Sequence, residues 1–248
     1  MSTFASPTDT EAFGEYSRPE SAPGREPFLG LLGSEEFPLE PGRYHLYAGW
    51  FCPWAQRVSL SVELDHLKDF VSVSYVDNER DARGWAFRED TGPDQVNGFS
   101  LLRQAYEAAR PGYDGHVSVP LLWDKVAGTV VTNDPATLAR SFPAAFDGVA
   151  GTLGATPAEG SAPPELREAI ADVERWLRLE NTGPAEWDAR LGDADFLVGD
   201  ALTQADVYLW VKLVRSQLDD AAFPRLAAYR DRLWALPAFQ ATTDASAF

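Results

Sequence analysis

Cys52 is the residue of this chain best placed to do chemistry. It follows the strand-like stretch Tyr44–Tyr47 and directly precedes Pro53, after which apolar residues recur at helix-like intervals as far as Leu64. Proline suits the first position of a helix because no backbone donor is lost there. The pattern predicts one thiol at a helix N-terminus, where the helix dipole and unpaired N–H groups favour the thiolate and lower a thiol pKa from about 8.5.

The same position leaves two interpretations of Cys52 open. A thiolate would be a nucleophile, whereas a lone buried cysteine can also be an inert small hydrophobe. Cys52 is the only cysteine among 248 residues, so a disulfide within the chain is impossible. The elements that surround Cys52 therefore decide how far its chemistry can be inferred.

The elements around Cys52 are expected to form a thioredoxin-like domain. A strand over 44–48, a helix over 54–66 and a strand over 71–76 make a βαβ unit whose strands should be parallel. The elements that follow run in the order helix, strand, strand, helix, and cover 100–109, 119–123, 129–132 and the residues from Asp134–Pro135 onward. This order of elements is that of a thioredoxin-like α/β domain.

Composition divides the chain into four parts. They are an extended N-terminal arm rich in Pro, Gly, Ser and Glu, a thioredoxin-like thiol-binding domain, a Gly/Ala/Pro/Ser-rich linker and an all-α substrate-side domain, over 1–42, 43–146, 147–164 and 165–248. Within the last part, helices are predicted over Glu165–Leu179 and Asp206–Val214. Thr203 and Asp206 have the spacing of a capping box, which is a structural signal at a helix start.

Composition and charge exclude several classes of partner. A formal net charge of −17 argues against nucleic acid and anionic membranes, since both require positive patches. A content of 45% apolar and 12% aromatic residues suits a globular chain with a sizeable core. The first residues have neither a basic region nor an apolar one, and no apolar run reaches the ~18 residues of a membrane span, so the cytoplasm is the expected location.

Several short segments of the chain form a co-linear set. In the N-terminal half they are Gly42–Tyr47, Cys52–Ala55, Gly84–Phe87, Val117–Lys125 and Asn133–Asp134, and in the C-terminal half Phe196–Arg215. Together they resemble the cytosolic glutathione transferases, and more narrowly the Xi class, the glutathionyl-hydroquinone reductases. The resemblance implies a thioredoxin-like N-terminal domain followed by an all-α domain, the glutathione-transferase-like fold, and it is compatible with a homodimer.

The resemblance also assigns roles to single residues. Cys52 would attack a glutathionyl-quinol adduct, forming a mixed disulfide that a second thiol resolves. Trp85 would pack against the bound thiol, its alternative being an ordinary core aromatic. Val119 would offer its backbone N–H and C=O to the cysteinyl part of that thiol, with Pro120 in the cis form. The alternative for Pro120 is that it only ends a strand.

Two departures from the family pattern bear on the choice of thiol and on catalysis. Where the family has Glu-Ser to hold the γ-glutamyl group of glutathione, this chain has Asp134–Pro135, and Pro135 supplies neither a hydroxyl nor an N–H. Asp134 and Pro135 would also make an ordinary N-cap and first helical residue. The catalytic tyrosine of the family has no counterpart either, because the nearest equivalent segment is Glu180–Ala185.

The expected function is therefore Cys52-dependent thiol chemistry without a metal. The preferred reaction is reduction of thiol conjugates of quinones, or of mixed disulfides, on a small hydrophobic or aromatic electrophile. The co-substrate would be a low-molecular-weight thiol, either glutathione or a thiol such as mycothiol whose sugar hydroxyls Asp134 could accept. The alternatives are thiol transfer to electrophiles and a non-catalytic, transferase-like binding module.

Overall fold

The computed structural model describes residues 4–20, 24, 26–65, 67–139, 161–179 and 182–247. Its sheet contains four strands in the order β2-β1-β3-β4, namely β1 (Tyr44–Gly49), β2 (Val71–Val76), β3 (Leu121–Asp124) and β4 (Thr129–Thr132). Strands β1 and β2 are parallel, and β3 is antiparallel to both β1 and β4. The thioredoxin-like order predicted from the sequence is confirmed.

The third strand is shorter at its start than the sequence pattern suggested. A strand over 119–123 was expected, but β3 begins at Leu121, which pairs with Tyr47 in β1. The peptide bond between Val119 and Pro120 is cis, as expected, and Pro120 has no N–H to give to a ladder. Val119 therefore lies just beyond the strand ladder.

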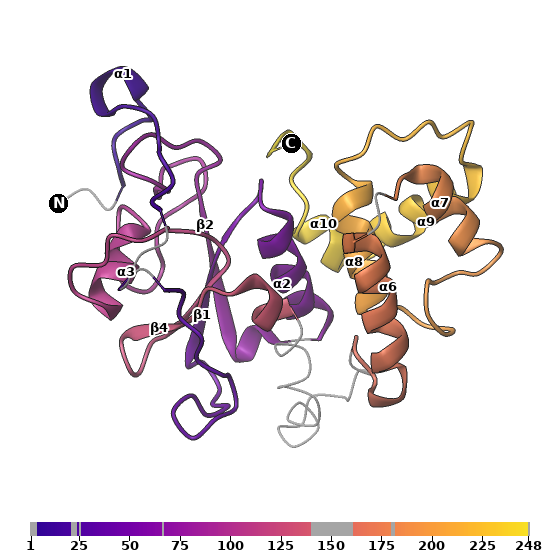
Figure 1. Cartoon of the computed structure of the whole chain (residues 1–248), viewed down its shortest axis with the longest axis horizontal. Coiled ribbons are helices and arrows are strands. Elements are labelled where there is room, and N and C mark those ends of the chain that lie inside the picture. The colour runs from indigo at the N-terminus through magenta and orange to yellow at the C-terminus, as the bar shows by residue number, and fades with distance from the viewer. Residues whose placement is uncertain are drawn as a thin grey trace. The chain divides into compact units, whose positions relative to one another are not determined.

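Two helices lie against the sheet on opposite sides (Figure 1). They are α2 (Pro53–Leu64), which follows β1, and α3 (Arg103–Ala109), which precedes β3. A short 3-10 helix, η1 (Leu67–Asp69), leads from α2 into β2. A further helical segment begins at Pro135 and is described as far as Ala139.

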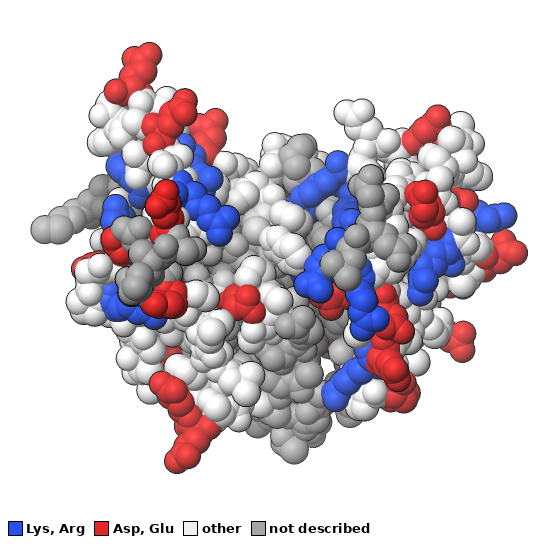
Figure 2. Space-filling model, viewed as in Figure 1, with Lys and Arg blue, Asp and Glu red and all other residues white. Residues whose placement is uncertain are grey.

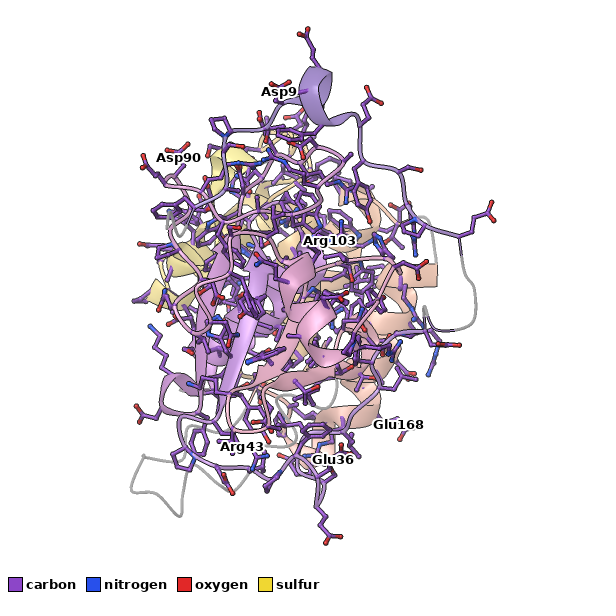
Figure 3. The ribbon with its side chains drawn as sticks, turned by 90° about the vertical axis from the view of Figure 1, so that its left-hand side faces the viewer. Asp9, Glu36, Arg43, Asp90, Arg103 and Glu168 are labelled. Carbon is purple, nitrogen blue, oxygen red and sulfur yellow. The ribbon has the colours of Figure 1, made fainter. Side chains whose placement is uncertain are left out.

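The N-terminal arm is held against the sheet domain at both of its ends. Its first part contains the short helix α1 (Thr10–Phe13), capped by Asp9, and Arg43, directly after its last residue, binds the buried Asp124 at 2.6 Å. Figure 3 shows Asp9 beside α1, with Arg43 and Glu36 together at the other end. Leu32 and Phe37 of the arm are buried. The arm thus contributes core residues, which its composition did not suggest.

The remaining regular elements of the described residues are helices, as predicted. The elements are η2 (Pro164–Leu166), α6 (Arg167–Leu179), α7 (Pro184–Leu191), α8 (Gln204–Leu213), α9 (Pro224–Trp234), α10 (Pro237–Ala241) and η3 (Ala245–Ala247). They share a core that includes Tyr208, which is 7% exposed. The predicted capping box is confirmed, because Asp206 accepts the Thr203 N–H at 2.8 Å and Thr203 accepts the Ala205 N–H.

The chain separates into two compact units. One consists mainly of Met1–Ser59 and Lys68–Ala145, and the other mainly of Leu60–Leu67 and Phe146–Ser246. Most of the linker predicted over 147–164 lies outside the described residues. Within the described ranges, no helix is long and apolar enough to cross a membrane, and no cluster of three or more His, Cys, Asp or Glu residues could hold a metal. On the face in Figure 2, acidic and basic side chains are interspersed.

Candidate functional site

Cys52 lies at the start of α2, as the sequence predicts. Its carbonyl accepts the Gln56 N–H at 2.9 Å, the first hydrogen bond of the helix, and its own N–H donates to the Gly49 carbonyl at 3.0 Å. Pro53 occupies the first helical position. Cys52 is buried, with 8% of the residue exposed.

The structure brings Cys52 and Val119 together. The Sγ atom of Cys52 donates to the carbonyl oxygen of Val119 at a distance of 3.5 Å. Since β3 begins only at Leu121, Val119 stands outside the ladder between β1 and β3. The cis peptide before Pro120 turns the chain at this point. One backbone carbonyl beside the thiol is therefore held by the loop that precedes β3.

Asp134 is the N-cap of the helical segment that begins at Pro135. Its Oδ2 atom accepts the Thr137 N–H at 2.7 Å, and its own N–H donates to the Thr132 hydroxyl at 3.1 Å. The Thr137 donor is therefore already engaged, and Pro135 has none. The ordinary capping interpretation of this pair is correct, while the second carboxylate oxygen of Asp134 leaves acceptor capacity for a ligand.

A cavity of about 570 Å³ is lined by residues of two segments, one containing Val119 and the other containing Asp134. It lies within the sheet domain, and its wall also includes residues of the N-terminal arm and of α2. The lining residues include Arg18, Trp54, His116, Ser118, Val119, Asn133, Asp134 and Pro135. Of the five predicted site residues, Val119 and Asp134 line this cavity, Cys52 and Pro120 adjoin Val119, and Trp85 is placed differently.

Trp85 is the central layer of a stack of side chains. Phe51 stacks on its ring at 4.2 Å with an interplanar angle of 23°, and the Arg80 guanidinium lies 4.3 Å from the centroid of the same ring. Two groups this close to one centroid must lie on opposite faces. Tyr16 follows as the next layer, 4.0 Å from Arg80. A bound thiol could reach the indole of Trp85 only at its edge, so the core-aromatic alternative fits the geometry better than face-on packing does.

The arm supplies site residues that the sequence analysis did not identify. The Tyr16 hydroxyl is 2.8 Å from Nδ1 of His116, and Arg18 lines the cavity. Burial, together with the charges of Arg18 and Arg80, lowers the pKa of His116. Nothing in the composition of the arm singles out Tyr16 or Arg18, and only the fold brings them to His116.

The comparisons with known proteins agree with this geometry. A family model described as the C-terminal domain of glutathione S-transferase matches residues 184–232. The glutathionyl-hydroquinone reductase PcpF of Sphingobium chlorophenolicum is 37% identical over 202 residues, which cover 71% of this chain and 63% of the relative. The glutathionyl-hydroquinone reductase YqjG of Escherichia coli is 33% identical over 232 residues, which cover 82% of this chain and 67% of the relative.

Solved structures give the same result. The glutathione-bound structure of YqjG matches with a TM-score of 0.76 and 28% identity, covering 92% of this chain and 87% of that chain. Glutathione S-transferase Xi from Phanerochaete chrysosporium matches with a TM-score of 0.75 and 27% identity, covering 89% and 87%. The chain spans about two thirds of the length of the two reductases whose sequences it matches.

The fold, the cysteine at the start of α2 and these relatives define a glutathione transferase. Within that family the chain belongs with the Xi class, as the match to the Xi transferase of Phanerochaete chrysosporium and to the two glutathionyl-hydroquinone reductases indicates.

Proposed function

We propose that the chain is a cysteine-dependent thiol reductase that removes a thiol from a conjugate. Cys52 would be the nucleophile and the cavity beside Val119 and Asp134 would hold the thiol part of the substrate. The observation that carries the proposal is the position of the Cys52 sulfur, at the start of α2 and 3.5 Å from the carbonyl of a cavity residue. The two glutathionyl-hydroquinone reductases that the chain resembles favour the same class of reaction.

The proposed reaction has two steps. The Cys52 thiolate attacks the sulfur of a thiol conjugate of a quinol, so that a sulfur–sulfur bond forms and the carbon–sulfur bond breaks. The electron pair of that bond stays on the ring carbon, which takes up a proton and leaves as the reduced quinol. A second thiolate then attacks the mixed disulfide, releasing Cys52 and a symmetrical disulfide. A mixed disulfide would be reduced by the same two exchanges, with a thiolate as leaving group.

The thiol that fits the cavity best is a sugar-linked thiol such as mycothiol. Asp134 offers acceptors that hydroxyl groups can use, whereas Pro135 provides no donor for a carboxylate and Thr137 already donates to Asp134. Arg18 is the one Lys or Arg among the described lining residues, and it is the feature that would favour glutathione. The affinities of both thiols are measured by titration into Cys52→Ser, with and without Arg18→Gln. The comparison separates the contribution of Arg18 from that of Asp134 and Pro135.

The test of the reaction is trapping of the intermediate. Incubation with a thiol conjugate should add the mass of the thiol to Cys52, and a reducing thiol should remove it. Cys52→Ser should keep the fold and lose both the adduct and turnover. A protein that releases quinol without a Cys52 adduct would contradict the proposed reaction, and one that forms no adduct and no product would be a binding module instead.

A further inference from the structure

Tyr106, in α3, has a buried hydroxyl that makes three hydrogen bonds to the Ser118 backbone and the Asn133 side chain, and the Ser118 hydroxyl lies 3.4 Å from the same oxygen. It donates to the Ser118 carbonyl at 2.8 Å, and it accepts from the Ser118 N–H at 3.1 Å and from Nδ2 of Asn133 at 3.1 Å. One donor and two acceptor positions complete the capacity of a phenol oxygen. Burial raises the pKa of Tyr106 to about 12, so the group remains a donor at neutral pH.

The partners of Tyr106 stand immediately before the two thiol-site residues. Ser118 precedes Val119 and Asn133 precedes Asp134, and all four of these residues line the cavity. Tyr106 itself is fully buried behind them. A single hydroxyl therefore ties together the two segments that form opposite parts of the site.

The bond to the Ser118 carbonyl also orients Val119. Among the described peptide bonds the one between Val119 and Pro120 is cis, so the one between Ser118 and Val119 is trans. In a planar trans peptide the C=O and the following N–H point in opposite directions. Holding the Ser118 carbonyl on Tyr106 therefore aims the Val119 N–H away from Tyr106 and fixes its direction.

Asn133 is held in the same way from two sides. Its Nδ2 donates to Tyr106, while its Oδ1 accepts the Phe28 N–H at 2.8 Å. The Asn133 amide thus has one partner on α3 and one in the N-terminal arm. Its backbone is fixed where the chain enters Asp134 and the following helix.

We propose that Tyr106 is a positioning residue for the thiol co-substrate, because its one hydroxyl fixes the backbone before Val119 and the side chain before Asp134. It touches neither the sulfur nor a reacting atom. The identity of the molecule in the cavity rests on the function proposed above. The placement of the two segments by Tyr106 is independent of that function, so it can be tested separately.

Tyr106→Phe removes only the hydroxyl. Glutathione and mycothiol are titrated calorimetrically into Cys52→Ser with and without this second change. We expect the thiol that binds to lose roughly tenfold or more in affinity, the equivalent of about 1.4 kcal/mol. In the protein that retains Cys52, the rate of iodoacetamide labelling should stay within about twofold of that of the unsubstituted chain. The reason is that Cys52 contacts the carbonyl of Val119, whereas Tyr106 fixes the direction of the Val119 N–H.

Tyr44→Phe is the matched control. Tyr44 is also fully buried, and its hydroxyl donates to the Pro38 carbonyl at 2.6 Å, in a part of the domain that does not line the cavity. It should lower the melting temperature without changing thiol affinity by more than about twofold. Equal thiol affinities in the two variants would overturn the positioning role and leave Tyr106 a purely structural residue.

Amide hydrogen exchange separates this inference from the proposed function. Loss of the Tyr106 hydroxyl should speed exchange of the Ser118 amide roughly tenfold, since that N–H loses its partner, while Tyr44→Phe should not. If the unchanged chain binds neither thiol, the proposed function fails, and the Ser118 exchange rate alone then decides the inference. Exchange at the rate of the unsubstituted chain would overturn it.

Discussion

The Sγ atom of Cys52 lies 3.5 Å from the carbonyl oxygen of Val119, 67 residues further along the chain. The helix start is expected to favour a thiolate at this sulfur, whereas the carbonyl, as an acceptor, favours the protonated thiol. A bound thiol whose amide N–H donates to the same carbonyl would compete with the Cys52 thiol for it. The contact therefore links occupation of the cavity to the reactivity of Cys52.

We expect Cys52 to be alkylated with an apparent pKa below about 8.5, because the N-terminus of α2 favours the thiolate. The rate of iodoacetamide labelling is measured from pH 5 to pH 10, and the chain has no other cysteine to confuse the result. N-acetylcysteine is the control thiol. A pKa at or above that of the control would establish Cys52 as an inert buried cysteine.

Reduction of a thiol-quinol conjugate should be slower than reduction of a mixed disulfide. The first reaction needs a proton on the leaving carbon, and the loss of a general acid typically costs ~10²–10⁴ in rate. The segment nearest to the one that carries the family's tyrosine is Glu180–Ala185, and it contains no tyrosine. In its described part Pro184 begins α7. Stopped-flow rates for both substrates, with Cys52→Ser as background, give the ratio. Faster cleavage of the conjugate would show that another acid replaces the tyrosine.

Pro135→Ser should raise affinity for glutathione by about tenfold or more, since it restores an N–H and a hydroxyl near Asp134. Calorimetry in the Cys52→Ser background avoids disulfide formation. Pro224→Ser is the matched control, because Pro224 is also the first residue of a helix, α9, in the other unit. If Pro135→Ser leaves glutathione affinity unchanged, the missing donors do not determine the choice of thiol.

Asp81→Asn should loosen the N-terminal arm and lower the free energy of unfolding by about 2–4 kcal/mol. Asp81 is fully buried, pairs with Arg83 at 2.7 Å and accepts the Asp9 N–H, while Arg83 donates to Ser6 and Pro7. Asp220→Asn breaks an exposed pair with Arg230 and should cost much less than Asp81→Asn. Urea unfolding and limited proteolysis of the arm measure both effects, and equal costs would show that Asp81 does not anchor it.

The same pair predicts a pH dependence. The Arg83 guanidinium, with the N–H groups of Asp9 and Arg83, holds the pKa of Asp81 below its usual value. The unfolded chain then binds the proton more tightly, so this stabilisation is complete above about pH 4 and is lost as the pH falls below it. In Asp81→Asn this part of the acid loss should disappear from unfolding curves recorded between pH 5 and pH 2. An unchanged acid profile would exclude the Asp81 pair as its source.

The sequence by itself determined the local elements of the site. Pro53 after an apolar strand is enough to put Cys52 at a helix start, and short runs rich in Val and Thr or Ser are enough to delimit β2 and β4, because these features depend on neighbours in the chain. The start of β3 was predicted two residues too early. The apolar pattern continues through Pro120, although proline has no N–H to donate to the hydrogen bonds of a strand ladder.

Only the tertiary structure decided which segments meet. Tyr16 and His116 are 100 residues apart, Asn133 and Tyr106 are 27 apart, and neither pair leaves a periodic signal in the sequence. Trp85 was expected to pack against a thiol, but Arg80 and Phe51 cover the two faces of its ring, a result of long-range packing. Local periodicity reports which face of an element is buried, whereas the identity of the buried partner depends on how the whole chain folds.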